Sequence, residues 1–421
     1  MIVGDGLAGA SAARTLREEG YDGRITLVGA QPHPPYERPP LSKAYLRGER
    51  PGEDAYVEPA GFWAEQEIEL LAGTVASRID LAQGRLELAG GGRLPFDVLL
   101  LAPGAAPRTM DMPGAGLDGV LTLRNFEDAD AIRTQAQTAE RVLIVGGGWI
   151  GCEVAASLRV LGCDVTVALR GRLPLERQLG SEMASVYREL HQEHGVRFLP
   201  ETRIMAFEGP GSVRRARTVS GQWLDYELVV VAIGVVPRTE LAAAAGLAVS
   251  DGLVVDGRLA TSDPRVFAAG DIALAPHADL GRSLRIEHWA TALAQGRHAA
   301  RAMLGAGQSY NETPYLFSDQ YETGMELFGD PDRQGELVVR GGPASYSFSA
   351  FWHQAGHVRT VLGMHVHHAH GHPDADAHGG GHLDPDTVGR LLRSPRPVPA
   401  AALADPHVPL EQLLDAGTPA G

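Results

Sequence analysis

The chain contains one lysine, Lys43, within the stretch ERPPLSKAYL (residues 37–46), and every other one of its 37 Lys and Arg side chains is an arginine. An ammonium group is a compact point charge on a flexible stem, whereas a guanidinium group is a rigid planar fork, so the two are not interchangeable. A lysine retained in an arginine-rich chain suggests a site that requires an ammonium group. A lone lysine can also persist by chance at an exposed position, and the residue alone does not separate these interpretations.

A glycine-rich motif near the start of the chain has the spacing of a dinucleotide-binding turn. The sequence GDGLAG follows a short apolar segment and precedes a predicted amphipathic helix that ends near Glu19 and a predicted strand at 24–28. In this context two glycines permit a tight turn and close approach to a pyrophosphate, and the third lets the helix pack on the strand. The helix N-terminus would stabilise the phosphate charge. The motif glycines are Gly4, Gly6 and Gly9.

A second motif, GGGWIG, follows the predicted strand RVLIV and precedes a predicted helix and the strand CDVTVAL. Either motif alone could be a glycine-rich turn that binds nothing. Two copies about 140 residues apart, each between a strand and a helix, predict two dinucleotide sites. The nucleotide-binding candidates in the second motif are Gly146, Gly148, Ile150 and Gly151.

Three shorter apolar runs extend this pattern. The runs FDVLLLAPG (96–104) and ELVVVAIGVVP (227–237) are predicted buried strands that end in glycine-containing loops, the second at Gly234. The run DPRVFAAGD (263–271) places Asp271 at the end of a strand, beside a segment predicted to form a helix. This carboxylate could accept hydrogen bonds from a sugar-like chain, or it could cap a helix.

The composition sets the class of protein. A chain of 421 residues is expected to form two or three domains, and 44% hydrophobic residues with 52 glycines are typical of an α/β protein with many tight turns. The net charge of −15 argues against nucleic acid or an anionic membrane as the main partner. No apolar run approaches the roughly 20 residues that a membrane-spanning helix needs.

The chain opens on MIVGDGLAG without the regions of a signal peptide, which predicts a cytoplasmic protein. The first strand is short, so we expect a few upstream residues to be missing from this numbering. The two cysteines, Cys152 and Cys163, form no CxxC motif, which excludes a disulfide framework and a dithiol relay. Cys152 is expected to pack as a small apolar residue at the start of a helix.

The segments LAPG, GGGWIGCEVA and VFAAGD resemble those of flavoprotein reductases with two dinucleotide-binding domains. PHPPYERPPLSKAYLRGE and FSDQYETGMELFG are similar to one branch, the FAD-dependent ferredoxin reductases that serve bacterial oxygenases and P450s, of the putidaredoxin reductase and biphenyl-dioxygenase reductase type. The resemblance covers about residues 1–365 and 384–415. It is specific because PPLSK replaces the cysteine-containing segment of disulfide reductases.

The resemblance implies an α/β fold of glutathione-reductase-like architecture, with two Rossmann-like domains and a smaller α+β C-terminal domain. Residues 1–108 and 239–311 would together bind FAD, and residues 109–238 would bind NAD(P)H. Residues 312–421 would form the C-terminal domain that covers the flavin edge.

The resemblance also implies the roles of individual residues. Lys43 would lie beside the flavin and pair with Glu153, and we expect these two to be the catalytic residues. Glu153 and the turn from Gly148 to Gly151 would face the nicotinamide nucleotide. Trp289 could instead be ordinary core. The residues expected to contact FAD are Gly6, Gly9, Arg38, Lys43, Val75, Arg124, Asp271, Trp289 and Phe317.

The implied reaction is hydride transfer from NAD(P)H to FAD, followed by electron transfer to a [2Fe–2S] ferredoxin or redoxin. Two alternatives stay open from the sequence. The electrons could go to a quinone, another small acceptor or oxygen, or the chain could be a flavoprotein in which nucleotide binding controls partner binding. A monomer and a homodimer are both compatible with the sequence.

The chain departs from the usual pattern where an acid would bind a ribose, about 20 residues beyond the glycines. In the first site this position is Ala30, followed by Gln31, so FAD would lose one anchor unless Gln31 substitutes for it. In the second site the position is Leu169, followed by Arg170 and Arg172. Loss of the acid and gain of cations suits a 2′-phosphate, which favours NADPH over NADH, although both arginines could simply be solvated.

Two other departures concern the C-terminal domain. Phe317 stands where the family often has tryptophan, so the apolar cover is kept while the indole N–H is lost. The segment HVHHAHGHPDADAHGGGH (365–382) is rich in histidine, which can bind Zn²⁺, Ni²⁺ or Cu²⁺. Its Gly, Pro and Asp residues indicate a loop with no preset ligand geometry, so we predict no functional metal site.

Overall fold

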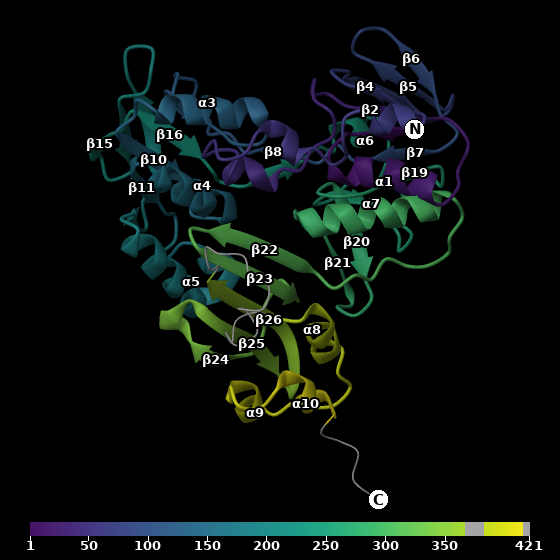
Figure 1. The fold of residues 1–421 in the computed structure, drawn as a ribbon. Coiled ribbons are helices and arrows are strands. Elements are labelled where there is room, and N and C mark those ends of the chain that lie inside the picture. Colours follow the sequence, from purple (N-terminus) through teal and green to yellow (C-terminus); the bar gives the residue numbers. More distant parts are fainter. Residues whose placement is uncertain (367–382, 416–421) are drawn as a thin grey trace, which may run out of the picture. The chain divides into compact units, whose positions relative to one another are not determined.

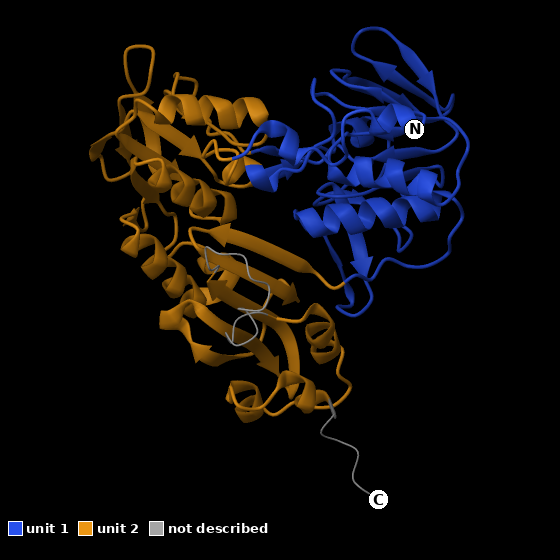
Figure 2. Ribbon diagram, in the orientation of Figure 1, with its two compact units in different colours: residues 1–40, 50–107, 235–312 blue, residues 41–49, 108–234, 313–421 orange. Residues whose placement is uncertain are grey.

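The computed structural model describes residues 1–366 and 383–415 of the chain and divides it into two compact units (Figure 2). Unit 1 comprises Met1–Pro40, Arg50–Pro107 and Val235–Glu312. Unit 2 comprises Leu41–Glu49, Arg108–Gly234 and Thr313–Gly421. Two differences from the predicted boundaries stand out: the segment Leu41–Glu49 groups with unit 2, and the C-terminal part groups with residues 108–234. The units do not reveal which nucleotide each part binds, so those assignments stay predictions.

Unit 1 is built on a five-stranded parallel sheet in the order β19-β7-β1-β2-β3 (Figure 1). The strands are short and consist mostly of Val, Ile and Leu, and all but the edge strand β3 are fully buried, as strands inside a parallel sheet usually are. The strands are β1 (Ile2–Val3), β2 (Ile25–Val28), β3 (Ile68–Leu71), β7 (Leu99–Leu101) and β19 (Val266–Ala268).

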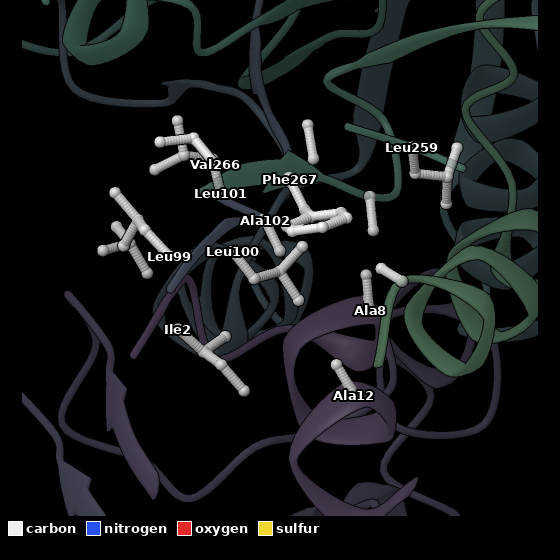
Figure 3. Close-up of a cluster of buried hydrophobic side chains, with 14 of the residues drawn as sticks. Ile2, Ala8, Ala12, Leu99, Leu100, Leu101, Ala102, Leu259, Val266 and Phe267 are labelled. Atoms are coloured by element: carbon white, nitrogen blue, oxygen red, sulfur yellow. The ribbon is translucent and has the colours of Figure 1, made fainter. Parts of the chain in front are cut away.

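Helices α1 (Leu7–Glu18) and α7 (Trp289–Met303) lie side by side in unit 1. Small residues permit this close approach: a Cβ atom on Gly296 of α7 would lie 2.3 Å from the carbonyl oxygen of Ala8 in α1. Figure 3 shows the core around Ile2, Leu100 and Phe267 of the sheet.

Short elements complete unit 1. The sheet β4-β5-β6 and the sheet β18-β20-β21 each have three strands, and β8 pairs with β17. Their bounds are β4 (Ala76–Asp80), β5 (Arg85–Leu88), β6 (Arg93–Pro95), β8 (Ala105–Pro107), β17 (Val235–Pro237), β18 (Leu253–Val254), β20 (Ala273–His277) and β21 (Arg282–Leu284). The short helices are η2 (Gly52–Ala55), α2 (Phe62–Glu65) and α6 (Glu240–Ala244).

Unit 2 contains a second five-stranded parallel sheet, in the order β12-β11-β10-β16-β9. Its strands are β9 (Val120–Leu121), β10 (Arg141–Val145), β11 (Asp164–Ala168), β12 (Arg197–Leu199) and β16 (Leu228–Val231). Its helices are α3 (Phe126–Ala136), α4 (Trp149–Val160) and α5 (Glu176–Glu193). A three-stranded sheet accompanies them, with β13 (Ile204–Glu208), β14 (Arg215–Thr218) and β15 (Trp223–Asp225).

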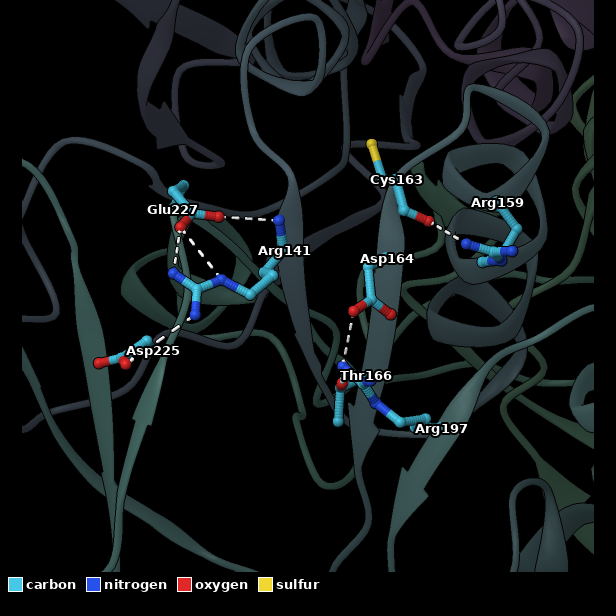
Figure 4. Close-up of polar contacts among 8 residues, drawn as sticks. All are labelled: Arg141, Arg159, Cys163, Asp164, Thr166, Arg197, Asp225 and Glu227. Carbon is cyan, nitrogen blue, oxygen red and sulfur yellow. Dashed lines mark hydrogen bonds and ion pairs between the residues drawn. The ribbon is translucent and has the colours of Figure 1, made fainter.

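Ion pairs join the strands of this sheet at their amino ends (Figure 4). Arg141, which begins β10, binds Glu227 with a nitrogen–oxygen distance of 2.6 Å. Arg197, which begins β12, binds Asp164 at the start of β11 at 2.8 Å. The second glycine motif follows the carboxyl end of β10. The ion pairs therefore lie at the amino ends of these strands, and the glycine turn lies at the opposite, carboxyl end.

The C-terminal part of unit 2 is an antiparallel sheet in the order β22-β23-β26-β25-β24. One of its clusters of buried side chains packs Phe348 and Trp352 with Tyr187 of α5, and another packs Val361 with Val388 of α8. The elements are β22 (Tyr315–Gln320), β23 (Thr323–Gly329), β24 (Glu336–Gly342), β25 (Ser347–Gln354), β26 (His357–Val366), α8 (Pro385–Leu392), α9 (Ala400–Ala404), α10 (Leu410–Asp415) and the short η3 (Pro343–Ser345).

The segment Leu41–Glu49 begins within the short helix η1 (Pro39–Ser42) and is held within unit 2 by side chains of α3. The Tyr45 hydroxyl donates to Asp130 Oδ1 at 2.9 Å, and the Arg133 guanidinium donates to the Tyr45 carbonyl at 3.3 Å.

The predicted α/β class with two parallel sheets and a C-terminal α+β part is confirmed. None of the helices in residues 1–366 and 383–415 is long and apolar enough to cross a membrane.

Candidate functional site

The first glycine motif forms the turn between β1 and α1, and its glycines serve different purposes. Gly4 has φ +107°, and a Cβ atom there would lie 2.1 Å from the carbonyl oxygen of Ala102. A Cβ atom on Gly9 would lie 1.9 Å from the carbonyl oxygen of Gly4. Gly6 has an ordinary extended φ of −72°, and nothing in the described structure lies within 4 Å of its Cβ position. The protein itself therefore does not require a glycine at 6, whereas a diphosphate approaching the α1 N-terminus would.

The other predicted FAD contacts in unit 1 are distributed over four segments. Arg38 lies with its guanidinium carbon 5.5 Å from the centre of the Tyr36 ring. Val75 lies between β3 and β4, and its side chain is 49% exposed. Trp289 begins α7 and is partly exposed, so it is not an ordinary core residue.

Asp271 follows β19 as predicted, and a helix lies beside this position, because the Gly270 N–H donates to Gln295 Oε1 of α7 at 2.9 Å. The next element in the chain is the strand β20, which begins at Ala273. Its backbone carbonyl accepts a hydrogen bond from Arg285 Nη1 at 3.2 Å, and the residue is partly exposed.

The second glycine motif repeats the arrangement of the first between β10 and α4. Gly146 has φ +110°, and Cβ atoms on Gly146 and Gly151 would lie 2.4 Å and 2.1 Å from backbone oxygens. Gly148 is again the open position, where the nearest atom to a Cβ would be Gln178 Nε2 at 3.7 Å. Ile150 is partly exposed in the first turn of α4. Unit 2 therefore has a second cradle of the shape that a diphosphate requires.

Lys43 and Glu153 lie together in unit 2. Lys43 Nζ is 2.9 Å from Glu153 Oε1, and the two side chains are only 14% and 8% exposed. The Phe317 ring is also close, with its centre 5.8 Å from Lys43 Nζ. Three of the predicted site residues, from the segment 41–49, α4 and β22, are thus brought into one cluster.

Sequence reasoning missed a buried hydrogen-bond chain that ends on Glu153. Ser42 Oγ donates to Glu153 Oε2, and Ser318 Oγ donates to Glu153 Oε1 at 2.7 Å. Gln320 Nε2 donates to Ser318 Oγ at 3.0 Å, and His191 Nε2 lies 2.7 Å from Gln320 Oε1. Ser42, Ser318 and Gln320 lie inside the quoted motifs PPLSK and FSDQ, which was an available signal, whereas His191 has none.

The charge on Glu153 sets the direction of every bond in this chain. A carboxylate only accepts, so Ser318 must donate to it and must in turn accept from the Gln320 amide nitrogen. The Gln320 oxygen then faces His191, which must carry its proton on Nε2. His191 Nδ1 is left as an acceptor for the Tyr321 hydroxyl, 3.1 Å away. Complete burial lowers the pKa of His191 to about 4, which agrees with a neutral ring.

Two predicted residues lie elsewhere in unit 2. The Arg124 backbone N–H donates to Asp128 Oδ2 at 2.8 Å, in the capping box that begins α3 with Asn125. Gly234 follows β16 with φ +98° and is exposed. Its carbonyl accepts from the Arg108 backbone N–H at 2.9 Å.

The residues beyond β11 divide into a buried one and two exposed ones. Leu169 is 2% exposed and packs under the glycine turn, 2.2 Å from where a Cβ of Gly147 would lie. Arg170 and Arg172 are exposed. Arg172 is engaged by Glu176, with a nitrogen–oxygen distance of 3.5 Å, and within the described residues no ion pair involves Arg170. The Glu176 carboxylate, which sequence reasoning missed, therefore lies beside Arg172.

Within residues 1–366 and 383–415, no group of three or more His, Cys, Asp and Glu side chains could hold a metal ion. The histidine-rich segment 365–382 lies outside the described residues except for His365 and Val366. Its predicted lack of a functional metal site stays a prediction.

Comparison with protein families gives two matches. Residues 1–296 match the family described as pyridine nucleotide-disulphide oxidoreductase, and residues 315–372 match the family described as reductase C-terminal. Rhodocoxin reductase of Rhodococcus erythropolis is 38% identical over 352 residues, which are 83% of this chain and 82% of that protein. The biphenyl dioxygenase system ferredoxin–NAD(+) reductase component of Paraburkholderia xenovorans is 38% identical over 340 residues, 81% of this chain and 83% of that protein.

Solved structures agree with these relatives. The ferredoxin reductase for the CYP199A2 system from Rhodopseudomonas palustris matches with a TM-score of 0.90 and 32% identity, over 98% of each chain. The covalent putidaredoxin reductase–putidaredoxin complex matches with a TM-score of 0.90 and 34% identity, over 99% of this chain and 97% of that one. The resemblance seen in the sequence motifs is thereby confirmed. The chain belongs to the pyridine nucleotide-disulphide oxidoreductase family, with relatives named as ferredoxin reductases.

Proposed function

We propose that this chain is an FAD-containing, NAD(P)H-dependent reductase that delivers electrons to a ferredoxin or redoxin of an oxygenase or P450 system. The observation that carries the proposal is the pair of dinucleotide cradles, one in each unit, with open Cβ positions at Gly6 and Gly148. The acceptor is supported by the names of the relatives, which are ferredoxin reductases, and by the solved complex of one of them with putidaredoxin.

Thiols are unsuited to carry the electrons in this chain. Its only two cysteines, Cys152 and Cys163, are buried and form no disulfide. Burial raises the pKa of both thiols, which opposes the thiolate that disulfide exchange requires. An external acceptor is consistent with this, although the family is named after disulfide chemistry.

We assign FAD to residues 1–108 and 239–311, the nicotinamide nucleotide to 109–238, and the cover of the flavin to 312–421. Bound FAD would supply the chemistry of the reaction, because it takes a hydride and gives up single electrons. The backbone at Gly6 and the α1 N-terminus would hold its diphosphate, and the turn Gly148–Gly151 would hold that of the coenzyme. The further contacts that we propose with FAD are Gly9, Arg38, Val75, Arg124, Asp271, Trp289 and Phe317.

Lys43 would place a fixed positive charge in the site, where it stabilises negative charge that arrives with the hydride. Glu153 holds the ammonium group at 2.9 Å, and the hydroxyl groups of Ser42 and Ser318 hold Glu153. The protein thus orients and polarises the site, and no acid–base pair is required.

The choice of coenzyme rests on Leu169, Arg170 and Arg172. With no acid to bind a 2′-hydroxyl and two arginines after β11, we propose that NADPH is favoured over NADH. The relatives do not support this preference, because their names state NAD(+). Within this chain, the pairing of Arg172 with Glu176 leaves Arg170 as the cation through which the preference would act.

An absorbance spectrum of the purified protein, before and after anaerobic addition of NADH or NADPH, tests the proposal. We expect about one FAD per chain, bleaching on reduction, and turnover that depends on an added ferredoxin. A protein that neither contains nor binds FAD would overturn the proposal. Equal turnover with quinones and no response to a ferredoxin would overturn the acceptor alone.

A further inference from the structure

The carboxylate of Asp5 lies over the end of strand β2. A Cβ atom on Gly29, the residue after β2, would lie 1.8 Å from Asp5 Oδ2 and 2.1 Å from Asp5 Cγ. Gly29 has no left-handed φ, and the three atoms nearest to that Cβ position all belong to Asp5. The lack of a side chain at 29 is therefore explained by the space that Asp5 occupies.

This position is where dinucleotide sites usually place an acid from the second strand, which accepts hydrogen bonds from the ribose hydroxyls. The side chains of Ala30 and Gln31 provide no carboxylate at this position. Ala30 has no polar atom, and Gln31 Oε1 already accepts from the Tyr36 hydroxyl at 2.6 Å.

An acid between the motif glycines Gly4 and Gly6 is otherwise unfavourable, because it would repel a diphosphate bound at the α1 N-terminus. The packing over Gly29 turns the Asp5 carboxylate toward the end of β2 instead. Burial raises the pKa of Asp5, while a backbone hydrogen bond to its carboxylate and the nearby Arg38 and His33 favour its charged form. Within the described residues no side chain forms a hydrogen bond or ion pair with this carboxylate.

The neighbouring backbone connects Asp5 to Val75, one of the residues expected to contact FAD. The Gly29 N–H donates to the Leu71 carbonyl at 3.0 Å, and the Gly29 carbonyl accepts from the Thr74 N–H at 2.7 Å. Val75, whose side chain is 49% exposed, follows directly. The end of β2 thus combines an apolar exposed side chain with a carboxylate that has acceptor capacity to spare.

We propose that Asp5 accepts the hydrogen bonds of the adenosine ribose hydroxyls of the dinucleotide that unit 1 binds, and so replaces the acid missing at Ala30 and Gln31. This inference rests on the proposed binding of FAD. The residue that recognises the ribose diol would then be Asp5, which lies within the glycine motif between Gly4 and Gly6.

The test is FAD binding to the apoprotein, measured by quenching of flavin fluorescence. We expect Asp5→Ala to weaken binding about tenfold or more, as expected for the loss of hydrogen bonds to a charged group. The matched control is Asp22→Ala, which removes an exposed acid between α1 and β2. Asp5→Asn, of the same shape, is expected to lose part of the affinity, and thermal unfolding of each apoprotein reports on its folding.

A modified ligand makes the test independent of folding. The wild-type protein is expected to bind FAD that lacks the 2′-hydroxyl of the adenosine ribose more weakly than it binds FAD. The Asp5→Ala variant is expected to bind the two ligands with equal affinity. The double variant Asp5→Ala, Ala30→Glu, which returns the acid to its usual place, is expected to recover affinity.

Two outcomes separate this inference from the proposed function. FAD binding that is equal in Asp5→Ala and Asp22→Ala, or discrimination against the modified ligand that survives Asp5→Ala, would overturn the inference alone. A wild-type apoprotein that binds no FAD would overturn the proposed function and the inference with it.

Discussion

Lys43 Nζ lies 2.9 Å from Glu153 Oε1, and this ion pair is almost entirely shielded from water. Removing one partner of a shielded pair leaves an uncompensated charge, which costs more than the pair itself contributes. The pair and its two hydroxyl donors therefore form one unit, and their energetic effects should not add.

The first prediction concerns this unit. We expect Lys43→Met and Glu153→Gln each to slow the reduction of bound flavin by NAD(P)H about tenfold or more, since about 1.4 kcal/mol corresponds to a factor of ten. The double variant should lose less than the sum of the two effects. Stopped-flow absorbance of the oxidised flavin measures the rates.

The control for this set of single and double variants is an exposed ion pair. Arg24 and Glu69 are 63% and 43% exposed, so Arg24→Met should change the rate and the free energy of unfolding very little. Strictly additive effects of Lys43→Met and Glu153→Gln would contradict the coupling.

The second prediction concerns pH. Because the pKa of His191 falls from 6.5 to about 4 in the folded protein, the unfolded chain binds more protons between these values. The contribution of His191 to stability is therefore present above pH 6.5 and lost as the pH falls toward about 4. His191→Gln keeps a donor for Gln320 but cannot titrate. We expect the stability gap between wild type and this variant to narrow by about 2 kcal/mol from pH 7.5 to pH 5.

Urea unfolding at both pH values measures this gap. His194, which is partly exposed and stacks on Tyr321 with ring centres 3.7 Å apart, provides the matched control as His194→Gln. A gap for His191→Gln that stays constant with pH would show that folding does not lower the pKa of His191.

The third prediction separates the glycines of the first motif. Gly6→Ala should fold nearly as well as wild type, because its Cβ position is open, yet it should lose FAD. Gly9→Ala should be destabilised by about 1–3 kcal/mol, because its Cβ would press on the Gly4 carbonyl. Thermal unfolding of the apoproteins and FAD titration distinguish the two. A Gly6→Ala protein that retains FAD with wild-type affinity would place the diphosphate elsewhere.

The fourth prediction concerns the coenzyme. If NADPH is preferred, Arg170→Ala should lower kcat/KM for NADPH by roughly tenfold and leave that for NADH unchanged, since a charge-assisted contact is lost. Glu176→Gln should raise kcat/KM for NADPH, because it releases Arg172 while keeping an acceptor for the backbone. A wild-type protein that prefers NADH would mean that both arginines serve only the solvent-exposed surface.

The fifth prediction concerns the C-terminal helices. The Arg340 guanidinium donates to the backbone carbonyls of Leu403, Asp405, Pro406 and Val408. A lysine has one nitrogen and cannot reach four carbonyls, so Arg340→Lys should loosen α9 and α10. Limited proteolysis should then cut within residues 400–415 much earlier than in wild type. Arg78→Lys, a change of an exposed arginine in β4, should leave the pattern unchanged.

The elements around the glycine motifs were predictable from the sequence because strand, turn and helix are adjacent in it and their signals are local. The pairing of Lys43 with Glu153 came from the family resemblance, since no periodicity connects positions so far apart. The grouping of Leu41–Glu49 with unit 2 and the position of His191 were not predictable, because they depend on long-range contacts. The His191–Gln320 bond, for example, joins residues 129 positions apart. The helix beside Asp271 is α7, whose Gln295 accepts from the Gly270 N–H, and the residues that directly follow Asp271 pair as β20.

A brief local opening of the segment Leu41–Glu49 would separate the Lys43–Glu153 ion pair, so hydrogen exchange in this segment reports on that pair. Three backbone hydrogen bonds close it on itself, from the N–H groups of Arg47, Gly48 and Glu49. When the segment opens, the Lys43 ammonium leaves and Glu153 remains as a buried anion without its counterion. Glu153→Gln leaves the Lys43 ammonium without its counterion while the segment is closed, so the amide hydrogens of this turn should exchange with solvent faster than in wild type.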